Sequence, residues 1–499
     1  MAAPHRTVEH VDVLIVGAGL SGVGAACHLQ TECPDRSYAV LESRGAIGGT
    51  WDLFRYPGIR SDSDMFTLGY AFRPWTDSQA IADGAAIRGY IEDTAREYGV
   101  AERIRFHHQV LSAEWSSGEA RWTVTARRTD TGETVRLTCS WLSTCAGYYR
   151  YDEGFRPEFP GEERFGGELI HPQHWPEDFD ATGKRIVVIG SGATAVTLVP
   201  NLAGAAAHVT MLQRTPSYVM SLPGRDPLAQ FLRSKLPVRL AYPIVRWKNV
   251  LVSTAFYQFS RRWPTAARTV LRRMTRKQVP DVDVDTHFNP PYDPWDQRLC
   301  LVPDGDLFRT LRRGQATIAT GRIETFTRTG VQLESGEHLD ADVIVTATGL
   351  NLLAMGGMTL SVDGAPVELA ETVSYKGMML SGVPNFSMVI GYTNASWTLK
   401  ADLVNRYVCR LIGFLDARGY ASATPVAPPE GADQPFLDLA SGYVQRSLAD
   451  LPRQGRRRPW KLHQNYVRDV RLMRRGSLED EGMTFQRRVS APTNEKAVA

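Results

Sequence analysis

Two apolar runs, far apart in the chain, each lead into a glycine-rich turn. Val13–Val16 precedes Gly17, Gly19, Ser21 and Gly22, and Ile186–Ile189 precedes Gly190, Ser191, Gly192, Ala193, Thr194 and Ala195. A short continuous apolar run predicts a buried strand, and sequence of helical character follows each turn. Strand, glycine turn and helix in this order predict two βαβ units of the Rossmann type.

Each predicted unit continues with a second apolar strand and closes on a strand that ends in small residues. The second strands are Tyr38–Leu41 and Val209–Leu212, and the late strands are Leu142–Gly147 and Val343–Gly349. Small residues at a strand end leave room for the chain to cross between two nucleotide-binding domains. The pattern predicts an α/β fold with two Rossmann-like dinucleotide-binding domains, the second inserted in the first.

A basic, aromatic-rich segment is expected to form a helical insert in the second domain. From Arg225 to Lys277 there are 13 Lys/Arg and one acid, Asp226. One interpretation is a helical lid with a solvated basic face, and the other is an amphipathic surface that rests on anionic membrane. The predicted boundaries are 1–150 and 346–499 for the first domain with the C-terminal region, 151–220 and 298–345 for the second domain, and 221–297 for the insert.

Composition narrows the class of protein. The formal net charge of +3 over 499 residues gives no reason to expect a nucleic-acid partner. The six cysteines form no C-x-x-C pair, so we expect reduced thiols and no metal site. The apolar run at Val11–Val16 is too short for a signal peptide, and no stretch is long enough to span a bilayer. We therefore expect a cytoplasmic protein, with membrane association only through segment 225–277.

The first glycine turn has the context of a dinucleotide site. Glycines let the backbone approach a pyrophosphate, which then lies at the helix N-terminus, where the Ser21 hydroxyl adds a contact. Glu42 ends the second strand, 25 residues after Gly17. A carboxylate there accepts hydrogen bonds from an unphosphorylated ribose.

The corresponding position of the second unit is basic. Gln213 and Arg214 follow the second strand, with Arg214 24 residues after Gly190. A carboxylate here would repel a 2′-phosphate, whereas an arginine can bind it with two hydrogen bonds. The second cofactor is therefore predicted to be NADPH.

Two nucleotide sites in one chain indicate hydride transfer between cofactors, most often from NADPH to FAD. Disulfide reductases share this arrangement, but they need a cysteine pair near the flavin. No cysteine lies between Gly45 and Asp64, so dithiol chemistry is excluded.

Two longer motifs identify a family. Gly48–Asp62 reads G-G-x-W-x-x-x-R-Y-P-G-x-x-x-D, and Phe165–Pro176 reads F-x-G-x-x-x-H-x-x-x-W-P. At every fixed position the chain resembles the Baeyer–Villiger monooxygenases among the class B flavin monooxygenases. Trp175 favours them over the N- and S-oxidising enzymes, which usually have Phe or Tyr there. Tyr392–Asp402 and Pro294–Pro303 resemble a mycobacterial subgroup that also oxygenates sulfides and thioamides.

The resemblance implies roles for individual residues. Asp62 would orient the catalytic arginine, which falls on Arg298, and a fixed guanidinium would stabilise the C4a-peroxyflavin anion and the tetrahedral intermediate. The lysine that usually precedes this arginine is Gln297 here, which puts one 2′-phosphate contact in doubt. The remaining implied cofactor contacts are Gly49, Thr50, Trp51 and the backbone of Val110 for FAD, Ser61 and Asp62 for NADPH, and the turn Gly190–Ala195 for the NADPH pyrophosphate.

The expected activity is conversion of ketones to esters or lactones with O2, FAD and NADPH. The alternatives are a monooxygenase acting mainly on sulfur or nitrogen, and a flavin-binding redox or membrane-attached regulator without catalysis. The sequence does not specify the ketone or the oligomeric state.

Overall fold

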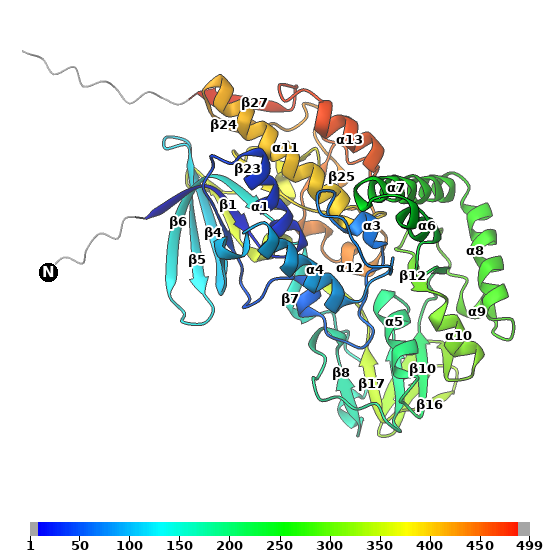
Figure 1. Cartoon of the computed structure of the whole chain (residues 1–499). Coiled ribbons are helices and arrows are strands. Elements are labelled where there is room, and N and C mark those ends of the chain that lie inside the picture. Colours follow the sequence, from blue (N-terminus) through cyan, green and yellow to red (C-terminus); the bar gives the residue numbers. More distant parts are fainter. Residues whose placement is uncertain (1–7, 488–499) are drawn as a thin grey trace, which may run out of the picture.

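The computed structural model describes residues 8–487, and its two largest sheets are separate and have parallel cores (Figure 1). The first sheet has the order β20-β19-β4-β5-β6-β1-β2-β3, and β23 also pairs with β6. Its parallel core consists of β1 (Glu9–Val16), β2 (Tyr38–Leu41), β3 (Ile104–Arg105), β6 (Thr134–Thr144) and β23 (Phe386–Met388).

A mostly antiparallel extension widens this sheet. β4 (His108–Ser116) and β5 (Arg121–Arg128) form a hairpin beside β6. β19 (Thr359–Val362) then pairs in parallel with β4, and β20 (Ala365–Pro366) pairs antiparallel with β19. Trp115 and Trp122 face each other in this hairpin and are almost fully buried. The helices α1 (Leu20–Glu32) and α11 (Trp397–Arg418) pack together.

The second sheet is entirely parallel, in the order β13-β10-β9-β17-β8. Its strands are β8 (Glu168–Ile170), β9 (Arg185–Ile189), β10 (His208–Gln213), β13 (Ala316–Thr320) and β17 (Val343–Thr346). All of them lie between the segments that build the first sheet. This confirms the prediction of two Rossmann-like units, the second inserted in the first.

The basic segment is helical, as predicted. It contains α6 (Pro227–Lys235), α7 (Val238–Arg262), α8 (Pro264–Gln278) and α9 (Val284–His287). At its base β11 (Val219–Leu222) pairs with β12 (Cys300–Pro303), so the insert leaves and rejoins the second unit at neighbouring strands. In Figure 1 α7 and α8 stand on the side of the molecule away from the first sheet.

Among residues 8–487 no helix is both long and apolar enough to cross a membrane. The C-terminal part contributes α12 (Gly442–Gln445) near the second unit and α13 (Tyr466–Arg475), which packs on α11.

Candidate active site

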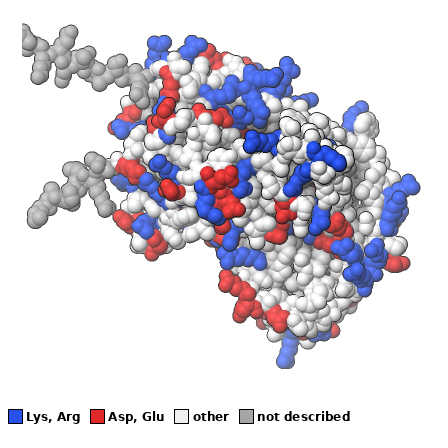
Figure 2. Space-filling view, in the orientation of Figure 1, with Lys and Arg blue, Asp and Glu red and all other residues white. Residues whose placement is uncertain are grey.

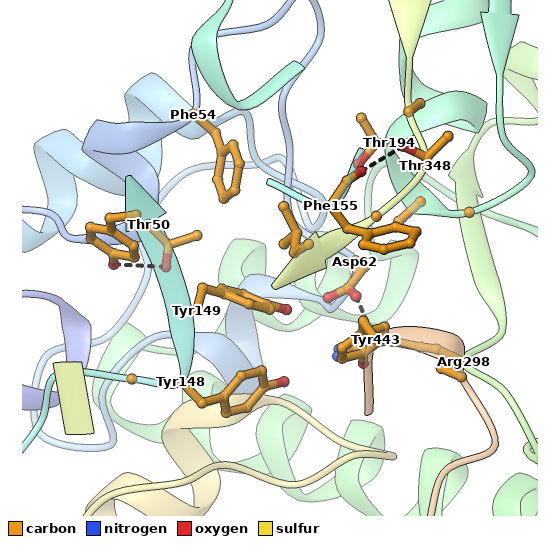
Figure 3. A pocket seen from close by; sticks show the side chains of 18 of the residues that line it. Thr50, Phe54, Asp62, Tyr148, Tyr149, Phe155, Thr194, Arg298, Thr348 and Tyr443 are labelled. Carbon is orange, nitrogen blue, oxygen red and sulfur yellow. Dashed lines mark hydrogen bonds and ion pairs between the residues drawn. The ribbon is translucent and has the colours of Figure 1, made fainter. Parts of the chain in front are cut away.

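A cavity of about 1270 Å³ lies between the two glycine turns. Its walls come from both turns, from the segment 48–63, from the chain crossing at 145–160 and from the C-terminal part, including α12 (Figure 3). Neither nucleotide unit could form this cavity alone.

The first turn has the geometry that a dinucleotide pyrophosphate needs. Gly17 has φ +102°, and a Cβ built there would lie 2.8 Å from the carbonyl oxygen of Cys145. Gly19 caps α1 without any side-chain hydrogen bond, so the first amides of the helix are available to an anion. Glu42 is 5% exposed at the end of β2, and it accepts hydrogen bonds from the amides of Ala18 at 2.7 Å and Arg44 at 2.9 Å.

The second turn repeats this geometry. Gly190 has φ +146°, and a Cβ there would lie 2.3 Å from the carbonyl oxygen of Ala347. Gly192 caps α5 (Ala193–Leu202), again without a side-chain cap. The Ser191 hydroxyl donates to the carbonyl of Thr215 at 2.9 Å, which ties the turn to the end of β10. Both turns therefore fit the two nucleotides that the sequence predicts.

The segment 48–62 is held against the first turn by a buried carboxylate. Asp52 is 3% exposed and pairs with Arg44 at 2.5 Å, Arg88 at 3.3 Å and Arg55 at 3.4 Å. The hydroxyl of Thr50 lies 3.3 Å from that of Tyr151. These ion pairs of Asp52 fix the loop. The turn that follows in the chain presents Asp62 to the cavity.

Asp62 and Arg298 meet inside the cavity, where Figure 3 shows them together. Arg298 Nε donates to Asp62 Oδ2 at 2.8 Å, and each side chain is about a third exposed, at 31% and 33%. Burial opposes the charge of the guanidinium, but Asp62 and the surrounding tyrosines outweigh it and raise the pKa of Arg298. A permanent cation therefore faces the space between the two nucleotide turns.

Three tyrosines surround this pair. Tyr148 and Tyr149 follow the first sheet at the chain crossing, and Tyr443 comes from α12. Burial raises the pKa of all three hydroxyls. They stay protonated near neutral pH and can donate hydrogen bonds into the cavity.

The structure brings most of the predicted site residues to this cavity. Those that line it are Gly17, Gly19, Ser21, Glu42, Gly49, Thr50, Trp51, Ser61, Asp62, Val110, Gly190, Ser191, Gly192, Ala193, Thr194, Arg214 and Arg298. Three others lie outside its lining. Gly22 lies against the first turn, where a Cβ would be 1.8 Å from the Gly17 carbonyl oxygen. Ala195 is buried in α5. The Gln213 side chain donates to the His287 carbonyl at 2.8 Å and to the Thr320 hydroxyl at 2.9 Å. Their positions support the turns and strand ends.

Several lining residues were not predicted. Besides the three tyrosines, they include Arg322, Trp397 and Arg446. Trp397 Nε1 donates to the Ser21 hydroxyl at 2.8 Å, and the Arg446 guanidinium lies 3.4 Å from the centre of the Phe155 ring. Only Tyr148 and Tyr149 had a sequence signal, since they follow a strand that ends in small residues. The others reach the cavity through contacts between distant segments.

Comparison with known proteins identifies relatives along almost the whole chain. Residues 77–355 match the family described as Flavin-binding monooxygenase-like, and residues 15–81 match an NAD(P)-binding Rossmann-like domain. The chain is 56% identical over 483 residues to the FAD-containing monooxygenase EthA of Mycobacterium tuberculosis, covering 96% of this chain and 98% of that protein. It is 44% identical over 491 residues to the probable FAD-binding monooxygenase AlmA of Acinetobacter baylyi, covering 96% and 97%.

Solved structures share the fold at lower identity. A steroid monooxygenase bound to NADP superposes with a TM-score of 0.76 at 23% identity, over 96% of this chain and 100% of that one. An open cyclohexanone monooxygenase gives 0.74 at 21% identity, over the same shares. The arrangement of two nucleotide units around one cavity is therefore a known fold.

Proposed function

Because the chain belongs to the flavin-binding monooxygenase-like family, we propose that it is an FAD-containing, NADPH-dependent Baeyer–Villiger monooxygenase. It converts ketones to esters or lactones with O2. The observation that supports this most directly is the Arg298–Asp62 pair in the cavity between the two turns. FAD, when bound, supplies electron transfer from NADPH and the activation of oxygen.

The chain's own residues hold and polarise the reactants in this proposal. The turn with Gly17 and Glu42 binds FAD, and the turn from Gly190 with Arg214 binds NADPH. Arg298 stabilises the negative charge that develops on the carbonyl oxygen of the ketone, because a guanidinium stays protonated and needs no reorganisation. Asp62 fixes its orientation. We also propose that the nucleotide-binding domains and the helical insert meet at residues 150, 220, 297 and 345.

The test is conversion of 2-octanone by the purified FAD-loaded protein with NADPH, with identification of the product. We expect an ester in the wild type and none in Arg298→Ala, which should still oxidise NADPH and release hydrogen peroxide. As a control, Arg214→Ala should raise KM for NADPH without changing the product. If Arg298→Ala forms the ester at the wild-type rate, the role of Arg298 is wrong. If the wild type oxygenates only sulfides or amines, the heteroatom activity replaces the proposed one.

We also propose that the helical insert contacts an anionic membrane surface. Of the thirteen large apolar side chains that are exposed among the described residues, ten lie between Leu228 and Met274. Seven of the 13 Lys/Arg of this segment form no ion pair within residues 8–487: Arg225, Arg233, Lys235, Arg239, Arg262, Arg273 and Lys277. In Figure 2 basic side chains lie over α7 and α8 with few acids between them. Exposed apolar and basic groups on the same helices suit the interface of an anionic bilayer.

Vesicle flotation tests this contact. We expect the wild type to float with vesicles that contain phosphatidylglycerol and not with pure phosphatidylcholine. Leu251→Glu with Val252→Glu, both more than half exposed on α7, should abolish flotation. Leu111→Glu, on the distant hairpin, is the control and should float like the wild type. Flotation that survives the α7 changes would contradict this surface.

A further inference from the structure

Two arginines follow the C-terminal ends of neighbouring parallel strands of the second sheet, and these ends face the cavity. Arg214 directly follows β10, and Arg322 follows β13 after one glycine. The strands pair with Gln213 opposite Thr320, and the amide of Gly321 donates to the Gln213 carbonyl at 3.0 Å. The two arginines therefore leave the sheet from adjacent points, and both line the cavity.

Neither guanidinium has a protein partner in the described part of the chain. By contrast, Arg185 at the start of β9 pairs with Asp342 at 2.8 Å and Asp340 at 2.9 Å. The nearest acid along the cavity wall is Glu334, whose amide donates to the Arg322 carbonyl at 3.0 Å. Its side chain forms no ion pair with Arg322 within residues 8–487. Two free cations thus face the same part of the cavity.

The order of the strands shows what these cations face. From the glycine turn after β9, the sheet continues to β10 and then to β13. In a Rossmann unit the adenosine ribose lies over the end of the strand next to the glycine turn, which here is β10. A phosphate on the ribose 2′-oxygen would therefore lie at the end of β10, where Arg214 and Arg322 leave the sheet from adjacent points.

Charge gives the reason for a second arginine. A phosphate monoester carries about −1.5 to −2 charges near neutral pH, so one guanidinium leaves it partly uncompensated. Gln297, which precedes Arg298, lines the cavity but has no charge. We infer that Arg322 and Arg214 together bind the 2′-phosphate of NADPH, so that Arg322 supplies the charge that Gln297 lacks. This inference rests on the proposed use of NADPH.

A different role would give a different pattern of affinities. A guanidinium that stacked on the adenine ring would stabilise NADPH and NADH equally, because both have the same adenine. A guanidinium that binds the 2′-phosphate discriminates between them. The selectivity for the phosphate therefore separates the two roles, and affinity alone does not.

Calorimetric titration of the FAD-loaded protein with NADP+, NAD+, 2′,5′-ADP and 5′-AMP tests the inference without turnover. Arg322→Ala should weaken NADP+ and 2′,5′-ADP by about tenfold or more and change NAD+ and 5′-AMP by less than about twofold. Glu334→Gln, which removes the neighbouring negative charge, should tighten NADP+ and leave NAD+ unchanged. Arg328→Ala, an exposed arginine after β14 (Ile323–Thr327), is the matched control and should change none of the four.

The outcomes separate this inference from the proposed function. If the wild type binds NADP+ no better than NAD+, the proposed use of NADPH fails and the inference fails with it. If the wild type is selective and Arg322→Ala keeps that selectivity, or weakens all four ligands equally, only the inference is overturned. The flavin absorbance of each variant shows that the fold is intact.

Discussion

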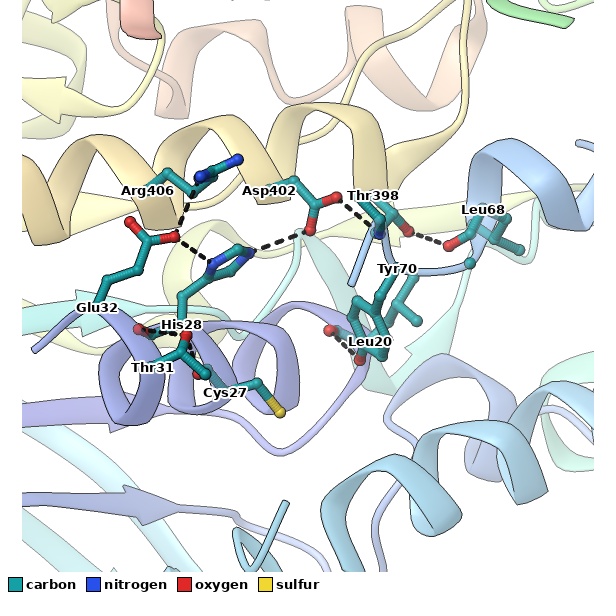
Figure 4. A network of polar contacts seen from close by, with 12 residues as sticks. Leu20, Cys27, His28, Thr31, Glu32, Leu68, Tyr70, Thr398, Asp402 and Arg406 are labelled. Atoms are coloured by element: carbon teal, nitrogen blue, oxygen red, sulfur yellow. Dashed lines mark hydrogen bonds and ion pairs between the residues drawn. The ribbon is translucent and has the colours of Figure 1, made fainter. Parts of the chain in front are cut away.

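Among single residues, His28 is a titratable group enclosed within the first unit. It is 6% exposed on α1, with Nδ1 at 3.1 Å from Glu32 and Nε2 at 3.4 Å from Asp402 of α11 (Figure 4). Arg406 and Arg246 also pair with these two carboxylates. Burial lowers the pKa of His28, but the hydrogen bonds and charges of Asp402 and Glu32 outweigh it and raise the pKa above its usual value.

This raised pKa predicts a dependence of stability on pH. A histidine whose pKa is higher in the folded state contributes stability that is fully present below about pH 6.5 and is lost as the pH rises through the folded-state pKa. His28→Gln should therefore lower Tm more at about pH 6 than at about pH 8.5. Thermal unfolding of the FAD-loaded protein measures this difference. His208→Gln, on β10 and without an ion pair among residues 8–487, should show no such difference. An equal loss of Tm at both pH values would contradict the prediction.

The residues that could be predicted from sequence are those whose place depends on the local backbone. Gly17 and Gly190 have positive φ at a strand-to-helix turn. Glu42 and Arg214 directly follow the next strand of each unit. The spacing of these residues along the chain therefore fixes their place in the fold. Tyr443 reaches the same cavity through the packing of α12, 253 residues after Gly190 and 426 residues after Gly17. No local pattern indicates a contact of that kind.

Among the elements, α7 is attached to the first unit by several contacts, in which the most buried cation is Arg246. Arg246 is 5% exposed, and its Nη1 donates to the carbonyls of Phe66 at 2.8 Å and Gly69 at 2.7 Å. Its Nη2 lies 3.3 Å from Asp402. Burial lowers the pKa of Arg246, but Tyr242 and Asp402 outweigh it and raise the pKa. The basic composition of the segment did not show that one of its cations is buried.

Arg246→Met should therefore weaken the attachment of the insert. The change removes one partner of Asp402, which keeps His28, and the donor to the carbonyls of Phe66 and Gly69. Breaking a buried pair in this way costs about 3–5 kcal/mol. We expect a lower Tm and faster tryptic cleavage within residues 225–277, measured on the FAD-loaded protein. Arg239→Met removes an exposed arginine of the same helix and should leave both unchanged. Wild-type cleavage kinetics in Arg246→Met would show that α7 is held by its other contacts, such as those of Tyr242 and Asn249.

In the whole molecule, function depends on how the two nucleotide units are oriented. Their nesting was predictable, because each unit repeats the same local pattern and the small-residue strand ends mark where the chain crosses between them. Their relative orientation was not, since it depends on contacts between side chains far apart in the sequence. The ion pairs between the units include the exposed contact of Arg55 with Glu177 at 3.3 Å and two less exposed pairs. Asp62 pairs with Arg298, and Arg60 pairs with Asp306 at the start of α10 (Asp306–Arg312).

The Arg60–Asp306 pair lies outside the reacting centre, so it can be changed without removing a group from the chemistry. Both side chains are largely buried, at 11% and 17% exposed, and the pair joins the loop that bears Asp62 to the second unit.

Hydride transfer from NADPH to FAD needs the two cofactors within about 3–3.5 Å, and a small displacement costs much of the rate. Asp306→Asn should therefore slow flavin reduction roughly tenfold while NADP+ affinity stays near that of the wild type. Stopped-flow loss of flavin absorbance measures the rate. Asp285→Asn, which breaks pairs with Arg272 and Arg276 inside the helical insert, should leave the rate unchanged. If both variants reduce flavin at the wild-type rate, the orientation of the units is set by other contacts, and the Arg298–Asp62 pair is the first to test.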